Sequence, residues 1–215
     1  MYLALLSQNT SANGKQAITQ LIQHLSNNTD KRISELKLTY IASAPDATKQ
    51  FFSPTAEFYK SVGINHIEYL EIEQPLSDVE LAMLYQADIV HLSGGDTYRF
   101  LHWLKQQNLL PMLRELANSG TCLIGVSAGA MIMSPDIAQA SLCGDENSIG
   151  LQDTCALGLI DKLFSPHASK SLDEQTQAKA FTKQLSHPVV LCSDDDAIVV
   201  TNDTVSYFGQ PMVIG

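Results

Sequence analysis

The chain has 215 residues, of which 45% are hydrophobic, and its formal net charge is −10. It can therefore bury the core of one ordinary domain, and since no stretch rich in Pro, Gly and Ser divides it, we expect a single domain over 1–215. Its 13 Lys and Arg residues are scattered along the sequence. They form no basic stripe that could bind nucleic acid or an anionic membrane, so we expect neither as a partner.

The first residues do not resemble a targeting segment. The apolar run 1–6 contains no basic residue and meets polar Ser7 too early for a signal peptide or a membrane span, so we expect a cytoplasmic protein. The four cysteines show no CxxC pairing, which favours reduced and mostly buried thiols. They and the six histidines do not fall at metal-ligand spacings, so we expect neither a metal nor another cofactor. The cysteines are Cys122, Cys143, Cys155 and Cys192.

Short β-branched runs alternate with segments of helical period along the chain. This pattern predicts an α/β fold, a doubly wound and mostly parallel sheet between two layers of helices. In chain order we expect strand 2–6, helix 14–25, strand 36–42, helix 46–61, strand 66–72, helix 78–85, strand 89–92, helices 98–106 and 110–117, strand 122–126, helix 172–185 and strand 189–192. Near the C-terminus, 197–201 and 204–208 flank Asn202 and Asp203, which predicts a small β-hairpin with a two-residue turn.

A serine lies where an apolar strand runs into small residues suited to a helix. The sequence 125–129 reads Gly-Val-Ser-Ala-Gly around Ser127, which is the context of a nucleophile elbow. Gly125 and Gly129 lack a Cβ, so the chain can approach itself closely there and leave the hydroxyl exposed. A tight turn with a capping serine is the competing interpretation, and the pentapeptide alone does not separate the two.

A second glycine turn, 93–97, follows the predicted strand 89–92. In a parallel sheet both turns lie at the carboxyl edge, where such folds bind ligands. The backbone N–H groups of Gly95 and Ala128 could then hold an oxyanion together. A phosphate-binding loop is the weaker alternative, because the stretch has neither the Lys-Ser/Thr of a P-loop nor a G-x-G-x-x-G pattern.

A serine nucleophile needs a base, and His167 is the histidine that stands apart. It follows Ser165 and Pro166 in a loop downstream of Ser127. The proline stiffens this loop and can fix the direction from which the imidazole approaches. The other five lie within or beside predicted helices and strands, where a histidine is more often structural. They are His24, His66, His91, His102 and His187.

Together, the stretches 93–97, 125–130 and 165–167 resemble the peptidase E (aspartyl dipeptidase) and cyanophycinase group of serine peptidases. The resemblance implies a sheet related to class I glutamine amidotransferases, with serine replacing their cysteine nucleophile. It also implies Ser127 as nucleophile, His167 as general base and acid, and the amides of Gly95 and Ala128 as oxyanion hole. The third triad member is expected to be an acid on a late strand.

The acid has four candidates. Asp194 is our first choice and Asp195 the second, because 190–198 occupies the place that the resemblance implies. Asp136 and Asp145 would instead restore the Ser…Asp…His order of α/β-hydrolases. Triads occur in several chain orders, so all four stay open.

The sequence therefore predicts a serine-type peptidase that cleaves short peptides through a Ser-His-acid triad, with a preference for an acidic N-terminal residue left open. The resemblance attributes that preference to an arginine a few residues beyond the histidine, but this chain has only Lys170 and Lys179 there. A lysine cannot form the bidentate fork. Arg99 is a further candidate cation.

Two other functions remain as alternatives. The same nucleophile would serve another serine acyl hydrolase, an esterase or amidase, and a non-catalytic ligand-binding module could use the same fold. The apolar pairs 51–52 and 58–59 could form a homodimer contact, although such faces are more often core. The polar segment 144–150 is a loop candidate near the site.

Overall fold

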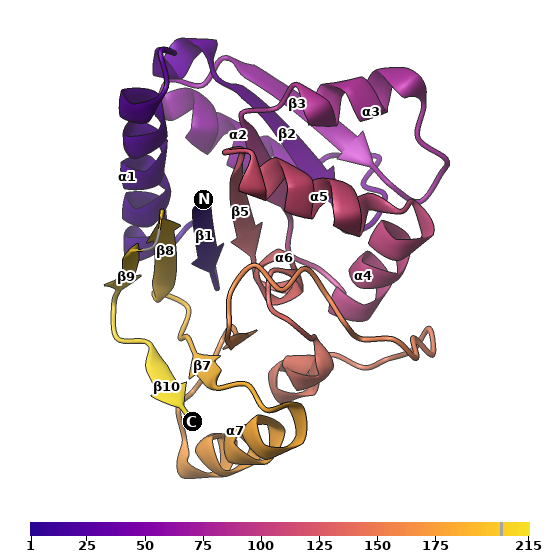
Figure 1. Cartoon of the computed structure of the whole chain (residues 1–215), viewed down its shortest axis with the longest axis vertical. Coiled ribbons are helices and arrows are strands. Elements are labelled where there is room, and N and C mark those ends of the chain that lie inside the picture. The colour runs from indigo at the N-terminus through magenta and orange to yellow at the C-terminus, as the bar shows by residue number, and fades with distance from the viewer. Residues whose placement is uncertain (203) are drawn as a thin grey trace.

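The computed structural model describes residues 1–202 and 204–215. Its main sheet has seven strands in the order β3-β2-β4-β5-β1-β8-β9 (Figure 1). Strands β1 to β5 run parallel to one another. Strand β8 pairs antiparallel with both of its neighbours, β1 and β9. The strands are β1 (Tyr2–Leu6), β2 (Lys37–Ala42), β3 (His66–Glu71), β4 (Ile89–Leu92), β5 (Cys122–Val126), β8 (Ala197–Thr201) and β9 (Thr204–Phe208). The predicted α/β class with a mostly parallel sheet is confirmed.

Helices cover both faces of this sheet. They are α1 (Ala12–Asn28), α2 (Phe52–Ser61), α3 (Asp78–Tyr85), α4 (Thr97–Gln106), α5 (Leu109–Asn118) and α6 (Ala128–Ile132). A further helix, α7 (Leu172–Leu185), packs elsewhere, and two short 3₁₀ helices span Ile33–Glu35 and Ala138–Cys143. Side chains alternate between the faces of a strand, so Leu3 packs with α3 to α6 and Ala4 packs with α1 and α2. Burial on both faces explains why these strands read as continuous apolar runs.

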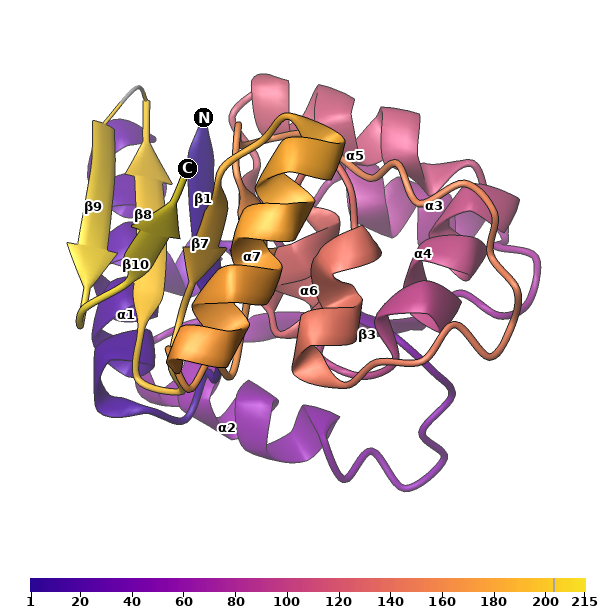
Figure 2. The same cartoon turned by 90° about the horizontal axis from the view of Figure 1, so that it is seen from below.

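The C-terminal part differs from the expectation. The strand expected at 189–192 is β7 (Val189–Leu191), and it lies in a separate three-stranded sheet, order β10-β7-β6, rather than in the main sheet. Figure 2 shows α7 lying across this small sheet. Its other strands, β6 (Leu163–Ser165) and β10 (Met212–Ile214), were not predicted, because three residues are too few for a periodic pattern.

The predicted C-terminal hairpin forms as β8 and β9, but it is not an appendage. Strand β8 pairs with β1, so the hairpin extends the main sheet. Of the two predicted turn residues, Asn202 is described, with a positive φ of 49°, and Asp203 lies outside the described residues.

The helix expected over 46–61 begins only at Phe52. The Asp46 carboxylate accepts hydrogen bonds from the Phe51 amide and the Thr48 hydroxyl, which folds the segment between them into a loop. Lys49 within it has a positive φ of 53°. Of the apolar pairs named above, Tyr59 is buried core whereas Phe51 is exposed.

All four cysteines are free thiols, with Cys122 and Cys192 buried, Cys143 partly buried and Cys155 exposed. Across 1–202 and 204–215, no helix is both long and apolar enough to cross a membrane.

The short helix α6 packs so closely on the sheet that two glycines are required. A Cβ on Gly125 would lie 2.6 Å from the carbonyl carbon of Gly129. A Cβ on Gly129 would lie 2.1 Å from the carbonyl oxygen of Leu92, at the end of β4. These contacts are with backbone atoms, which cannot swing aside as a side chain can.

We predict that Gly129→Ala lowers the free energy of unfolding by about 1–3 kcal/mol, because α6 must move away from β4. Gly94→Ala is the matched control, since its added Cβ would lie 3.5 Å from the Cβ of Ser127, an ordinary contact. Urea unfolding of both variants measures the difference. Equal stabilities would contradict the proposed close packing.

Candidate active site

Ser127 lies at the junction of β5 and α6 in a strained backbone conformation. Its φ is 50° and its ψ is −110°, a region that residues with a side chain rarely adopt. The Ser127 amide donates to the carbonyl of Leu6 at 2.8 Å, and the amides of Ala130 and Met131 donate to the Ser127 carbonyl. Strand pairing on one side and the helix on the other therefore hold the sharp turn that a nucleophile elbow requires.

His167 lies in the loop after β6 and also has a positive φ, of 56°. Its amide donates to the hydroxyl of Ser7 at 3.3 Å, and that hydroxyl donates to the carbonyl of Cys192 at 3.0 Å. The next amide, of Ala168, donates to the same carbonyl. Ser7 is 1% exposed and ends β1, so it fixes the histidine loop to the centre of the main sheet.

The three side chains Ser127, His167 and Asp194 form a hydrogen-bonded chain. Ser127 Oγ lies 2.9 Å from His167 Nε2, and His167 Nδ1 lies 2.6 Å from Asp194 Oδ1. Asp194 belongs to the segment between β7 and β8, so this chain joins the main sheet to the small one. A serine, an imidazole and a carboxylate hydrogen-bonded in this order form the arrangement used in serine acyl transfer.

The other three candidate acids contact different groups. Asp195 accepts hydrogen bonds from the Asn13 amide and side chain, at the start of α1. Asp136 accepts from the Ala138 amide and the Thr154 hydroxyl. Asp145, in the predicted loop 144–150, accepts from Thr97. Of the four, Asp194 alone touches the imidazole.

The second glycine turn lies against the serine. The Gly129 amide donates to the Ser93 carbonyl at 3.0 Å, which ties the two turns together. Gly95 has a φ of 142°, and a Cβ there would lie 2.2 Å from Ser43 Oγ, so this position requires glycine. Within the described residues, the amides of Gly95 and Ala128 have no hydrogen-bond acceptor. Both predicted oxyanion donors are thus free to bind a ligand.

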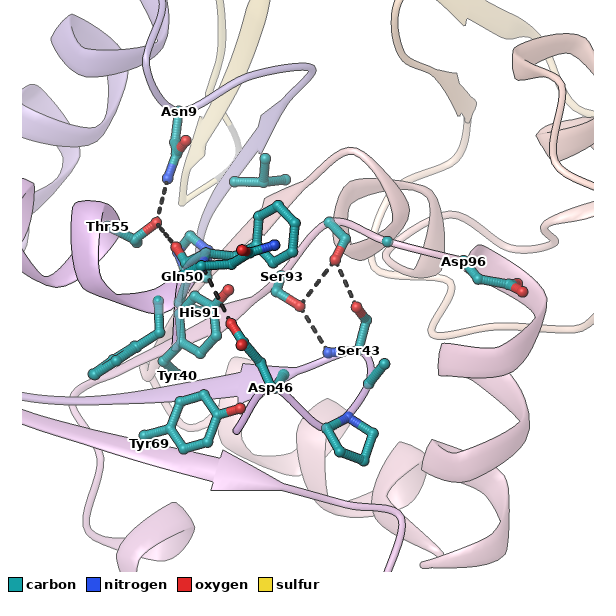
Figure 3. A pocket seen from close by; sticks show the side chains of 18 of the residues that line it. Asn9, Tyr40, Ser43, Asp46, Gln50, Thr55, Tyr69, His91, Ser93 and Asp96 are labelled. Carbon is teal, nitrogen blue, oxygen red and sulfur yellow. Dashed lines mark hydrogen bonds between the residues drawn. The ribbon is translucent and has the colours of Figure 1, made fainter. Parts of the chain in front are cut away.

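A cavity of about 710 Å³ opens beside the hydrogen-bonded side chains of Ser127, His167 and Asp194. Its lining includes Gly94, Gly95 and His167 near the serine, and extends to Tyr40 of β2 and Tyr69 of β3 (Figure 3). It therefore lies at the carboxyl edge of the parallel strands, as expected for a ligand site in such a fold.

His91 lies under the cavity and is uncharged. Burial lowers the pKa of its imidazole to about 3. The ring stacks on Tyr40 with centroids 4.8 Å apart, and Nδ1 is 2.8 Å from the Tyr59 hydroxyl. His91 is therefore part of the packed floor of the cavity and carries no positive charge at neutral pH.

Two of the cations named from the sequence are already paired within the protein. Arg99 donates to Glu73 through Nε at 2.6 Å and Nη2 at 2.8 Å. Lys170 Nζ donates to the Asp196 carboxylate and to the Gln210 carbonyl. Asp196 is 3% exposed and also accepts from Ser193. The sequence did not indicate this buried pair, because three consecutive aspartates normally form a solvated turn.

The match with known proteins agrees with this architecture. The model of Peptidase family S51 matches residues 3–208. The fold and this match define a serine peptidase family. The chain belongs to Peptidase family S51, which confirms the resemblance noted in the sequence.

Relatives point the same way. The chain is 25% identical over 194 residues to Peptidase E of Salmonella arizonae, covering 90% of this chain and 80% of the relative. It is 30% identical over 173 residues to an uncharacterized peptidase of Listeria innocua, covering 72% and 81%. A solved structure of a peptidase from an acI-B1 Actinobacterium shares the fold with a TM-score of 0.71 at 18% identity, covering 99% of this chain and 90% of that one.

The Lys170–Asp196 pair generates a stability prediction. Burial alone would raise the pKa of Asp196, but hydrogen bonds from Lys170, Ser193 and Gln210 outweigh it and lower the pKa. Lys170→Met leaves this buried carboxylate without its charged partner. We expect the free energy of unfolding to fall by about 3–5 kcal/mol at pH 7, with Lys170→Arg closer to the wild type.

The effect must depend on pH with a definite sign. Because the folded-state pKa of Asp196 is lowered, its contribution is complete above the ordinary aspartate pKa of about 3.9. It is lost as the pH falls through the folded-state value. Urea unfolding from pH 7 to pH 3 measures the difference in unfolding free energy between wild type and Lys170→Met. This difference should narrow below about pH 4. A gap that stays constant would contradict this origin.

Proposed function

We propose that the protein is a serine peptidase that cleaves short peptides, with Ser127 as nucleophile, His167 as general base and acid, and Asp194 as the orienting carboxylate. The observation that carries the proposal is the hydrogen-bonded chain from Ser127 through His167 to Asp194, placed on a strained strand-to-helix turn. Membership of a peptidase family supports peptide bonds as the target.

The geometry accounts for each step of acyl transfer. His167 Nε2 takes the proton of Ser127 Oγ as the oxygen attacks the peptide carbonyl, and the amides of Gly95 and Ala128 bind the oxygen that becomes negative. His167 then returns the proton to the leaving amine, and a water molecule activated by the same nitrogen releases the acyl group. Asp194 accepts from Nδ1–H, which keeps Nε2 available as the base.

The exposure of the site favours ready hydrolysis, and the size of the cavity favours small substrates. The side chains of His167 and Asp194 are 40% and 60% exposed. Water can therefore reach the acyl-enzyme directly. The substrate side is bounded by a cavity of about 710 Å³, a size suited to one or two residues of a short peptide.

A fluorophosphonate probe tests the nucleophile. We expect one adduct, found by intact mass and mapped to Ser127, because the base and the free amides activate this hydroxyl. Ser127→Ala should give no adduct and should keep the wild-type unfolding curve. An unlabelled, well-folded native protein would overturn the assignment and favour a ligand-binding module.

Substitution of neighbouring aspartates tests the acid. Asp194→Asn should lower kcat by about 10³–10⁴-fold while KM changes little, because the imidazole loses the partner that sets its tautomer. Asp195→Asn is the matched control, since this neighbour contacts Asn13 instead. Its kcat should stay within about threefold of wild type, as expected for a residue outside the hydrogen-bonded chain. Equal losses in the two variants would refute the assignment of Asp194.

A further inference from the structure

The cavity beside Ser127 has an aromatic wall. Tyr40, Phe52 and Tyr69 pack against one another, with ring centroids 5.2 Å apart for Tyr40 and Phe52 and 5.0 Å apart for Phe52 and Tyr69. Phe51 also lines the cavity but is 69% exposed, so it lies at the rim with most of its surface free. Aromatic surfaces of this kind gain most by covering another apolar or aromatic group.

The charged side chains of the lining are carboxylates. Among the residues that line the cavity, Asp46 and Asp96 are acidic, and none is Lys or Arg. Figure 3 shows Asp46 next to the tyrosines and Asp96 on the other side, at the start of α4. Burial would raise the pKa of Asp46, but hydrogen bonds from Phe51, Thr48 and Lys49 outweigh it and lower the pKa, so this carboxylate is charged at neutral pH.

The nearby cations do not supply a receptor for a substrate carboxylate. Lys170 and Arg99 are held by Asp196 and Glu73. Lys49 is not part of the lining, and its Nζ lies over two rings of the aromatic wall, 4.7 Å from the centroid of Tyr69 and 5.9 Å from that of Phe52.

We propose that this cavity receives the substrate side chain next to the cleaved bond, and that it selects an uncharged aromatic residue over an acidic one. The inference rests on the proposed function, because it assumes attack by Ser127. Gly94, Gly95 and His167 line the same cavity, which places its inner end beside the reacting atoms. An acidic side chain would lose its hydration beside Asp46 without gaining a cation. An aromatic side chain would bury its ring against Tyr40, Phe52 and Tyr69.

A series of dipeptides Phe-Leu, Ala-Leu and Asp-Leu tests the selection. We expect kcat/KM for Phe-Leu to exceed that for Ala-Leu by about tenfold or more, since an apolar pocket discriminates side chains by amounts of this order. Asp-Leu should fall below Ala-Leu. Hydrolysis of Asp-Leu as fast as that of Phe-Leu would overturn the inference.

Diphenyl phosphonates that carry the side chain of Phe, Ala or Asp separate this inference from the proposed function. They modify an activated serine without a peptide leaving group. Faster modification of Ser127 by the Phe compound supports both ideas. Fastest modification by the Asp compound overturns the pocket inference and leaves the nucleophile in place. No modification of folded protein by any of them overturns both.

Three surface variants sharpen the test. Phe51→Arg places a cation at the exposed rim and should raise the ratio of kcat/KM for Asp-Leu to that for Phe-Leu by about tenfold, the effect of one charge-assisted contact. Val79→Arg is the matched control, because Val79 is 70% exposed on α3 and does not line the cavity, and it should leave the ratio unchanged. Lys49→Met should also leave it unchanged. Loss of Asp-Leu hydrolysis in Lys49→Met would identify Lys49 as a receptor for acids and overturn the inference.

Discussion

The strained backbone of Ser127 is the constraint on which the rest of the structure depends. A residue with a side chain adopts this φ and ψ only where its surroundings over-determine it. Here β1 fixes the Ser127 amide, and α6 fixes its carbonyl through two hydrogen bonds. Gly125 lets α6 pack closely on β5, and Gly129 lets it approach β4 more closely than any larger residue would permit. The central strands and the first turn of one short helix therefore act together to present a single hydroxyl.

The site around that hydroxyl draws on distant parts of the sequence. Ser7, at the end of β1, holds the loop that carries His167. The segment between β7 and β8 carries Asp194. Three adjacent aspartates then perform three separate tasks. Asp194 meets the imidazole, Asp195 meets the start of α1, and Asp196 is buried against Lys170. One turn thus joins the proposed base, an N-terminal helix and the histidine loop.

The sequence could predict the part of this arrangement that depends on local patterns. The strands 2–6, 89–92 and 122–126 have the observed bounds because they are apolar runs ended by polar residues or glycine. The start of α2 could not be predicted, because a hydrogen bond from the Phe51 amide to the Asp46 carboxylate replaces the first turns of a helix. Of the small sheet, only β7 was predicted, because β6 and β10 are three residues long and pair with a strand from a distant part of the sequence.

The proposed site shows the same division. Ser127 and His167 could be chosen from motif and loop context, and the structure places them in contact. The sequence favoured Asp194 but left four aspartates open, because the contacts of each carboxylate depend on the folded structure. Neighbouring aspartates in the chain have unrelated partners. The aromatic wall of the cavity comes from β2, β3 and the start of α2, none of which carries a recognisable motif. Substrate selection is therefore the property that is hardest to predict from this sequence.

One face of the small sheet packs with α7 in a cluster of six buried residues. Phe164 of β6 and Val190 of β7 belong instead to the large core cluster of the main sheet. Segments with a modest core of their own can open at lower free energy than the whole molecule. His167 follows β6 and Asp194 follows β7, so both proposed partners of Ser127 are attached to this smaller unit. Separation of this unit from the main sheet would expose Phe164 and Val190 and would move both proposed partners away from Ser127. The docking of the two sheets is therefore as important to the proposed site as the stability of the parallel sheet itself.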